Sequence, residues 1–446
     1  MLLAIALALT SATTSFDVSG VRVILRQNDA NNVVAANLYF LGGTRQVTDA
    51  NAGIEPILLD VSERGTAKYP KNSLRRAMSR LGSEIVVAPS ADWTMMGIRS
   101  STEVFDSTWA IFADRVMHPT LAKSEIALVK AQYLSGIRQR RDDPDALADY
   151  LADSIAFVGH PYAISVVGNE KSIQSLDSAA LREYHQSQFV TSRMLLVVVG
   201  NVDRAHIERL VSQTLGQLPR GSYKWSAPPR VPESPTALVV ERRQLPTNYI
   251  LGYYSGPLAN GPDYQALRVA TSVLTGRMFA EIRTRQNLTY DVHAPFVDRA
   301  ATAGGLYVST VAPDTTLKLM RAAVVDLQTG MLDPVGLKEL EQQFITEYFL
   351  DNETNAAQAD FLARSQLYEG DYREADRFVD ELKSVTPVPP LNVPPAPIAQ
   401  AASVDVALKF PLPLLFVVFQ IPCSVSSRKN TPLGVGAVGA NALANC

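Results

Sequence analysis

The sequence predicts an α+β protein built from two similar halves, and three observations support this fold class. Apolar residues recur at strand-like and helix-like spacings, in alternation, along most of the 446 residues. Residues 218–235 hold five prolines and a glycine, which cannot continue a helix or a strand, so this segment is predicted to link two domains. After the linker, the order of strands and helices of the first half begins again.

The composition fits a large globular chain and excludes several functional classes. With 47% hydrophobic and 19% charged residues, the chain can bury enough core for two or more domains. Forty-one basic and forty-four acidic residues give a net charge of −3, so we expect no nucleic-acid partner. Cys423 and Cys446 lie near the C-terminus, so no disulfide framework organises the chain. The five histidines show no pair at metal-ligand spacing: His118, His160, His185, His206 and His293.

Residues 1–15 resemble an export signal. Leu2–Leu9 is a short apolar run, and the small residues Thr10-Ser11-Ala12 after it offer a cleavage site. No Lys or Arg precedes the apolar run, although signal peptides usually begin with a positively charged region. The alternative to an export signal is a frayed N-terminal strand. We expect the chain to be exported, to the periplasm if the source is a bacterium.

The first half is predicted to span residues 16–217. Its strands are expected at 21–26, 33–40, 84–88, 93–99 and 194–199, and its helices at 71–81, 104–117, 125–141, 145–157, 181–189 and 204–217. A further helix is predicted between Gly53 and Gly65, because Ile54, Ile57, Leu58 and Val61 give it one apolar face.

The second half is predicted to span residues 236–386. Its strands are expected at 237–241, 248–254, 289–296 and 305–311, and its helices at 264–274, 278–285, 317–329, 335–351, 355–368 and 372–384, with a turn at Thr275-Gly276. Residues 387–446 contain ten prolines and depart from this pattern, which indicates either a shifted reading frame or a natural Pro-rich tail. The apolar run 408–422 is interrupted by proline and too short to be an integral membrane segment.

The order of motifs in the first half resembles the insulinase-like (pitrilysin) family of zinc metallopeptidases. The matching segments are Leu41-Gly42-Gly43-Thr44-Arg45, the helix after Gly53, Gly65-Thr66, Asp92-Trp93-Thr94 and the turn His160-Pro161-Tyr162. The resemblance implies two similar domains, each an antiparallel sheet with helices over one face, that face each other like a clamshell. We expect His160 to be a packing residue of its turn.

In that family the helix carries His-x-x-Glu-His, which provides two zinc ligands and the general base. Pro56, Leu59 and Asp60 stand at these positions here. The third ligand of the family is a glutamate about two turns before Asp142-Asp143-Pro144, where this chain has Gly136. Four changes at four catalytic positions predict that this chain binds no zinc and holds no cofactor.

The second half keeps a motif that the resemblance connects with catalysis. Arg283 is followed seven residues later by Tyr290, which matches the arginine–tyrosine motif of the family. Both side chains can donate hydrogen bonds to a peptide carbonyl and to the oxyanion formed from it. The alternative is a solvated helix residue and a sheet-edge residue without a catalytic role.

The resemblance therefore implies a non-catalytic subunit of a heteromeric zinc metallopeptidase. Its partner would be a homologous subunit that bears the zinc, and the substrate a peptide or an unfolded polypeptide. The chain would be inactive alone and active only in the complex. The rival hypothesis is an inert clamshell scaffold or peptide-binding protein, which has no reason to keep Arg283 and Tyr290.

Overall fold

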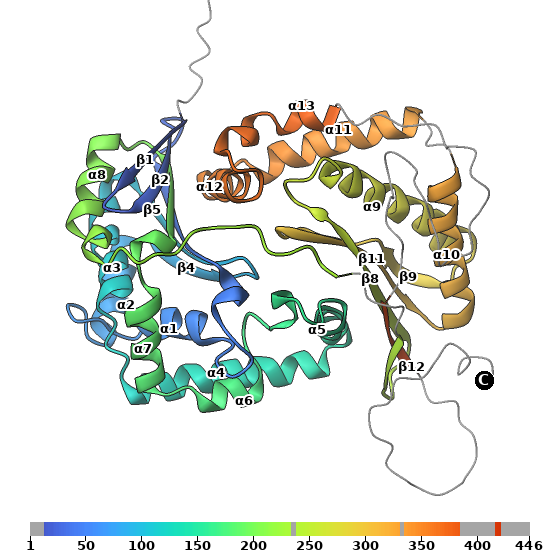
Figure 1. Ribbon diagram of the computed structural model, residues 1–446, viewed down its shortest axis with the longest axis horizontal. Coiled ribbons are helices and arrows are strands. Elements are labelled where there is room, and N and C mark those ends of the chain that lie inside the picture. The colour runs from blue at the N-terminus through green and yellow to red at the C-terminus, as the bar shows by residue number, and fades with distance from the viewer. Residues whose placement is uncertain (1–12, 233–237, 331–333, 384–414, 421–446) are drawn as a thin grey trace, which may run out of the picture. The chain divides into compact units, whose positions relative to one another are not determined.

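The computed structural model describes residues 13–232, 238–330, 334–383 and 415–420. In this part of the chain two compact units form, each around one β-sheet (Figure 1). The prediction of an α+β fold with two similar, mainly antiparallel sheets covered by helices is confirmed.

The first sheet has the strand order β1-β2-β6-β3-β5-β4. Its strands are β1 (Thr13–Val18), β2 (Val21–Gln27), β3 (Val33–Leu41), β4 (Glu84–Pro89), β5 (Trp93–Ser101) and β6 (Met194–Gly200). Only β2 and β6 pair in parallel. The helices of this part of the chain are α1 (Ile54–Ser62), α2 (Asn72–Leu81), α3 (Phe105–Met117), α4 (Lys123–Asp142), α6 (Glu170–Ser175), α7 (Ser178–Gln188) and α8 (Arg204–Gln213).

The second sheet has the order β10-β11-β8-β12-β7, and β9 also pairs with β11. Its strands are β7 (Leu238–Arg242), β8 (Asn248–Leu258), β9 (Thr289–His293), β10 (Phe296–Val297), β11 (Ala301–Thr310) and β12 (Leu415–Gln420). The remaining helices are α5 (Pro144–Ala156), α9 (Tyr264–Met278), α10 (Pro313–Thr329), α11 (Pro334–Asp351), α12 (Asn355–Arg364) and α13 (Phe378–Lys383).

Strand β12 completes the repeat between the two sheets. It is parallel to β7 and antiparallel to β8, as β6 is parallel to β2 and antiparallel to β3. This strand lies within the segment 387–446 predicted as a Pro-rich tail, so residues 415–420 belong to the sheet. The rest of that segment lies outside the described residues.

The two units do not follow the consecutive halves 16–217 and 236–386. Residues Ser135–Ser165, which include α5, belong with the second sheet, and Tyr348–Asp376, which include α12, belong with the first. Helix α12 covers β3 and β6, while α5 covers β8 and β12. Each sheet is therefore covered partly by a helix from the other half of the sequence.

The contacts of strand β3 show that the first sheet has helices on both faces. The ring of Phe40 lies 4.6 Å from that of Phe189 at the end of α7, while the neighbouring Tyr39 hydroxyl donates to Asp360 of α12. Successive side chains of a strand point to opposite faces, so α7 and α12 lie on opposite sides. The second helical layer was not predicted.

Several element boundaries differ from the predictions for local reasons. Helix α9 continues through the predicted turn at Thr275-Gly276, and the Thr275 hydroxyl donates to the Thr271 carbonyl one turn earlier. The predicted strand 289–296 is divided into β9 and β10, with Pro295 between them. Strand β1 begins at Thr13, so the predicted signal boundary at residue 15 falls inside a strand, whereas Ala12 immediately precedes it.

Candidate functional site

Helix α1 is fixed by a buried ion pair at its first turn. Gly53, just before the helix, has φ +86°, and a Cβ there would lie 2.8 Å from the Val167 carbonyl oxygen, so this position requires glycine. Arg193 Nη2 lies 3.0 Å from Glu55 Oε2, and the Tyr184 hydroxyl donates to the same oxygen at 3.0 Å. Protein side chains therefore anchor the first turn of α1.

The residues at the three family positions on α1 offer at most one metal ligand. Pro56 and Leu59 are buried and have no donor atom in their side chains. The Leu59 carbonyl accepts hydrogen bonds from Arg115 Nη2 at 3.1 Å and from the Ser62 hydroxyl at 2.6 Å. Asp60 Oδ2 accepts a 2.7 Å hydrogen bond from the hydroxyl of Tyr133 on α4.

The surroundings of Asp60 do not fit a zinc ion. Burial raises the pKa of the Asp60 carboxyl, while the hydrogen bond from Tyr133 and the charge of Arg115 lower it in part. Burial also lowers the pKa of Arg115 to about 10, which leaves a buried cation near this carboxylate at neutral pH. In the described residues, Asp60 belongs to no cluster of three or more metal-ligating side chains. Gly136 on α4 has no side chain to add.

We therefore expect the purified chain to contain far less than one zinc ion per molecule, because a catalytic zinc needs about three protein ligands. Elemental analysis of the metal-equilibrated protein measures this directly, and about one zinc per chain would contradict it. The double variant Pro56→His with Asp60→His should also remain inactive, because the general base and the third ligand are still missing.

Arg283 and Tyr290 lie together in the second unit. The Arg283 Cζ is 4.9 Å from the centroid of the Tyr290 ring and 4.8 Å from that of Phe279. Residues Phe279–Arg285 form a π-helical segment that continues α9, and Asn287 at φ +52° turns the chain back into β9. The structure thus brings the two predicted residues into contact. Phe279, which also stands at a position that matches the family, lies four residues before Arg283, and this spacing places the two side chains side by side on one helical turn.

Arg283 differs from the neighbouring Arg285 in its electrostatic partners. Arg285 Nη1 donates to Glu281 Oε2 at 2.6 Å, and Gln286 donates to the other oxygen of that carboxylate at 3.1 Å. The guanidinium of Arg283, by contrast, forms no hydrogen bond or ion pair with any residue that the structure describes. The phenol of Tyr290 is 82% exposed. Both groups can therefore donate to an external acceptor.

Two segments that carry the family resemblance meet at the end of β3. The N–H groups of Gly42 and Thr44 donate to the carbonyls of Asp92 and Ala91 at 2.8 and 2.9 Å. A Cβ on Gly43, which has φ +48°, would lie 2.2 Å from the Ala91 oxygen, so only glycine fits. These segments form a rigid structural junction.

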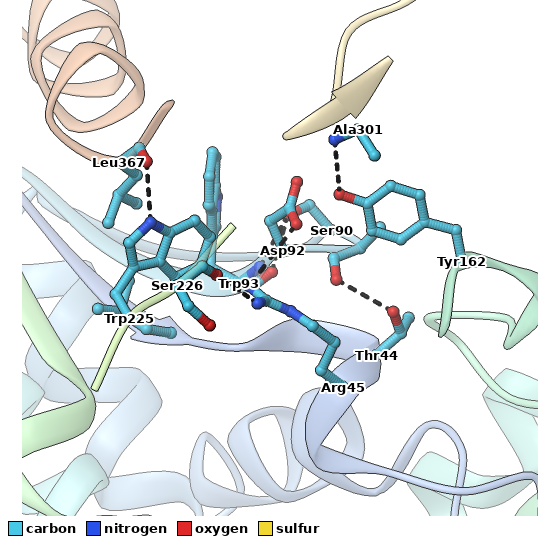
Figure 2. Close-up of polar contacts among 12 residues, drawn as sticks. Thr44, Arg45, Ser90, Asp92, Trp93, Tyr162, Trp225, Ser226, Ala301 and Leu367 are labelled. Atoms are coloured by element: carbon cyan, nitrogen blue, oxygen red, sulfur yellow. Dashed lines mark hydrogen bonds and ion pairs between the residues drawn. The ribbon is translucent and has the colours of Figure 1, made fainter. Parts of the chain in front are cut away.

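The arginine of this junction fixes the first part of the predicted linker. The Arg45 guanidinium lies 4.6 Å from the ring centroid of Trp225 and donates through Nη1 to the Ser226 carbonyl (Figure 2). Trp225 Nε1 in turn donates to the Leu367 carbonyl at 2.8 Å. Residues 225 and 226 are therefore packed against the first unit.

His160 has the predicted packing role, because its Nε2 forms a hydrogen bond with the Pro229 carbonyl at 2.9 Å.

The repeated sheets and the helix after β3 form the two-domain α+β architecture that the family resemblance implies. The chain belongs to the insulinase-like peptidase family M16. Residues 22–170 match the family model described as insulinase (peptidase family M16), and residues 175–343 match the one described as peptidase M16 inactive domain.

Individual relatives agree with this assignment. The uncharacterized zinc protease YmxG of Bacillus subtilis is 22% identical over 380 residues, which cover 82% of this chain and 91% of YmxG. A peptidase M16 inactive domain from Pseudomonas fluorescens has the same fold, with a TM-score of 0.81 and 18% identity over 93% of this chain and all of that one. The periplasmic protease PqqL of Escherichia coli gives a TM-score of 0.73 and 14% identity over 92% of this chain and 46% of PqqL.

Proposed function

We propose that this chain is the non-catalytic subunit of a heteromeric zinc metallopeptidase that hydrolyses peptides or unfolded polypeptides. Arg283 and Tyr290 would bind the carbonyl of the scissile peptide bond, while a homologous partner subunit supplies the zinc and the general base. The observation that carries the proposal is the contrast between the two sites. The helix of the metal site lacks the family's ligands, whereas the arginine and tyrosine side chains lie in contact and have no other polar side-chain partner among the residues that the structure describes.

The chemistry of the pair suits an oxygen that gains negative charge. The planar guanidinium of Arg283 presents several N–H donors, and the Tyr290 hydroxyl adds another. Hydrogen bonds aimed at such an oxygen are stronger in the transition state than with the neutral carbonyl, so they accelerate the reaction beyond simple substrate binding. An arginine without an ion-pair partner suits this role, because a neighbouring carboxylate would weaken the positive electrostatic potential that the guanidinium creates at the substrate oxygen.

An inert scaffold or peptide-binding protein with the same fold is the alternative function. A scaffold gains nothing from an unpaired arginine beside an exposed tyrosine, so the state of this pair favours the subunit hypothesis. We also propose that the chain is exported, with cleavage near Ala12 just before β1. None of the described helices combines the length and apolar character needed to cross a membrane.

The proposal is tested by comparing the chain alone, the partner alone and their mixture. The partner is a homologous chain from the same genome with an intact His-x-x-Glu-His, sought first in the adjacent gene. We expect the two chains to co-elute in gel filtration, and only the complex to hydrolyse a fluorogenic peptide efficiently. Hydrolysis by the isolated chain, or failure of every such homologue to associate with it, would contradict the proposal.

A further inference from the structure

We propose that Phe279 is a positioning residue for Arg283, so that the functional unit of this chain is a triad of Phe279, Arg283 and Tyr290. The inference rests on the proposed function, because it concerns how the arginine is presented to the substrate carbonyl. Its evidence is separate and consists of the ring contacts, the exposure of Phe279 and the backbone of the segment.

The exposure of Phe279 indicates that its ring is not a core residue. The side chain is 42% exposed, whereas Ile282 in the same segment is fully buried in the core below α9 and α10. A phenylalanine that leaves this much of its surface in water forgoes a large share of the free energy gained by burying an apolar ring. The Phe279 ring contacts the guanidinium of Arg283, whose Cζ lies 4.8 Å from the ring centroid.

Holding an arginine by aromatic rings has a consequence that an ion pair would not have. When a guanidinium stacks flat on an aromatic ring, the contact uses its face, and its hydrogen-bond donors point outward in the plane. The Phe279 and Tyr290 rings can therefore restrict the orientation of Arg283 while its N–H groups stay available. A carboxylate would occupy these donors, and Glu281, the acid nearest in sequence, is engaged by Arg285 and Gln286.

The backbone of the segment supports a specialised role. Gln286 N donates to the Glu281 carbonyl at 3.1 Å, five residues back, and Leu288 N donates to the Ile282 carbonyl at 3.0 Å. Such π-helical turns are rare and are found frequently at functional sites. Here the widened turn and the left-handed Asn287 return the chain so that Tyr290 reaches Arg283.

Two substitutions distinguish the effect of the aromatic face of Phe279 from the effect of its apolar volume. Phe279→Leu removes the aromatic face, and Phe279→Tyr keeps it. The first readout is the side-chain Nε–Hε resonance of Arg283 in the full chain, assigned through Arg283→Ala. In the wild type this resonance should be displaced by ring currents from that of Arg285, which pairs with Glu281. Phe279→Leu should move the Arg283 resonance toward that of Arg285, whereas Phe279→Tyr should leave it displaced.

The second readout is turnover by the assembled complex. Loss of an exposed cation–π contact should lower kcat about two- to fivefold in Phe279→Leu, with KM unchanged and activity retained in Phe279→Tyr. Phe349→Leu is the matched control, because Phe349 is 62% exposed and its ring lies against Tyr348 instead. This control should change neither readout.

The outcomes distinguish the inference from the function on which it rests. If Arg283→Ala lowers turnover but Phe279→Leu leaves both the resonance and kcat unchanged, the positioning role is rejected and the proposed function stands. Equal effects of Phe279→Leu and Phe279→Tyr also reject the role of the ring. If Arg283→Ala leaves turnover unchanged, the proposed function fails, whatever the resonance shows.

Discussion

Replacing Arg283 by alanine is expected to lower peptide turnover by the assembled complex about 10²–10³-fold or more, because it removes a charged donor to the developing oxyanion. The loss should appear mainly in kcat, since the interaction strengthens as the reacting oxygen gains charge. Association of the subunits and the zinc content of the partner should remain those of the wild type. Turnover of a fluorogenic peptide and gel filtration of the same sample measure these quantities.

Arg285→Ala is the matched control for this experiment. Arg285 lies two residues away, is 73% exposed and forms an ion pair with Glu281 four residues earlier. Its loss should change turnover little, because exposed ion pairs contribute little and its guanidinium contacts no ring in the described residues. Equal losses in Arg283→Ala and Arg285→Ala would indicate a general effect of positive charge and would contradict the specific role of Arg283.

Arg193→Leu is expected to lower the free energy of unfolding by about 3–5 kcal/mol, because it leaves the charge of Glu55 buried without its partner. The two side chains are only 1% and 4% exposed. Arg193 also donates to the carbonyls of Leu41 and Gln188, at 2.9 and 3.1 Å, so these acceptors lose a donor too. Urea unfolding followed by circular dichroism measures the change.

Arg285→Leu is the control for this stability prediction. The Arg285–Glu281 pair is exposed and joins residues four positions apart on one helical segment, so its loss should cost less than about 1 kcal/mol. If Arg193→Leu costs no more than this control, Arg193 and Glu55 do not hold α1 in place.

The strands of the core could be predicted from the sequence, but the exchange of helices could not. Strands β3 and β5 were predicted closely, because long apolar runs mark strands buried on both faces. An amphipathic pattern shows which face of a helix is buried, but not which sheet it covers. The pattern of residues 355–368 therefore indicated a helix without indicating that Asp360 contacts Tyr39, more than 300 residues earlier.

The candidate site was predictable in its residues and not in its geometry. The seven-residue spacing of Arg283 and Tyr290 gained meaning only from the family resemblance. Their contact depends on a π-helical turn and on Asn287 at positive φ, neither of which has a clear sequence signal. The degenerate metal positions were visible directly, whereas Tyr133, which binds Asp60 from 73 residues away, requires the tertiary fold.

The most direct test of the central claim is the kcat of the complex that contains Tyr290→Phe in this chain. The substitution removes a single exposed hydroxyl group, so the fold and the partner's zinc content should not change. The proposed role predicts that kcat falls by roughly 10²–10³-fold, as for the loss of one oxyanion donor. Wild-type kcat in both this variant and Arg283→Ala would contradict the active-site role and leave the scaffold as the function of this chain.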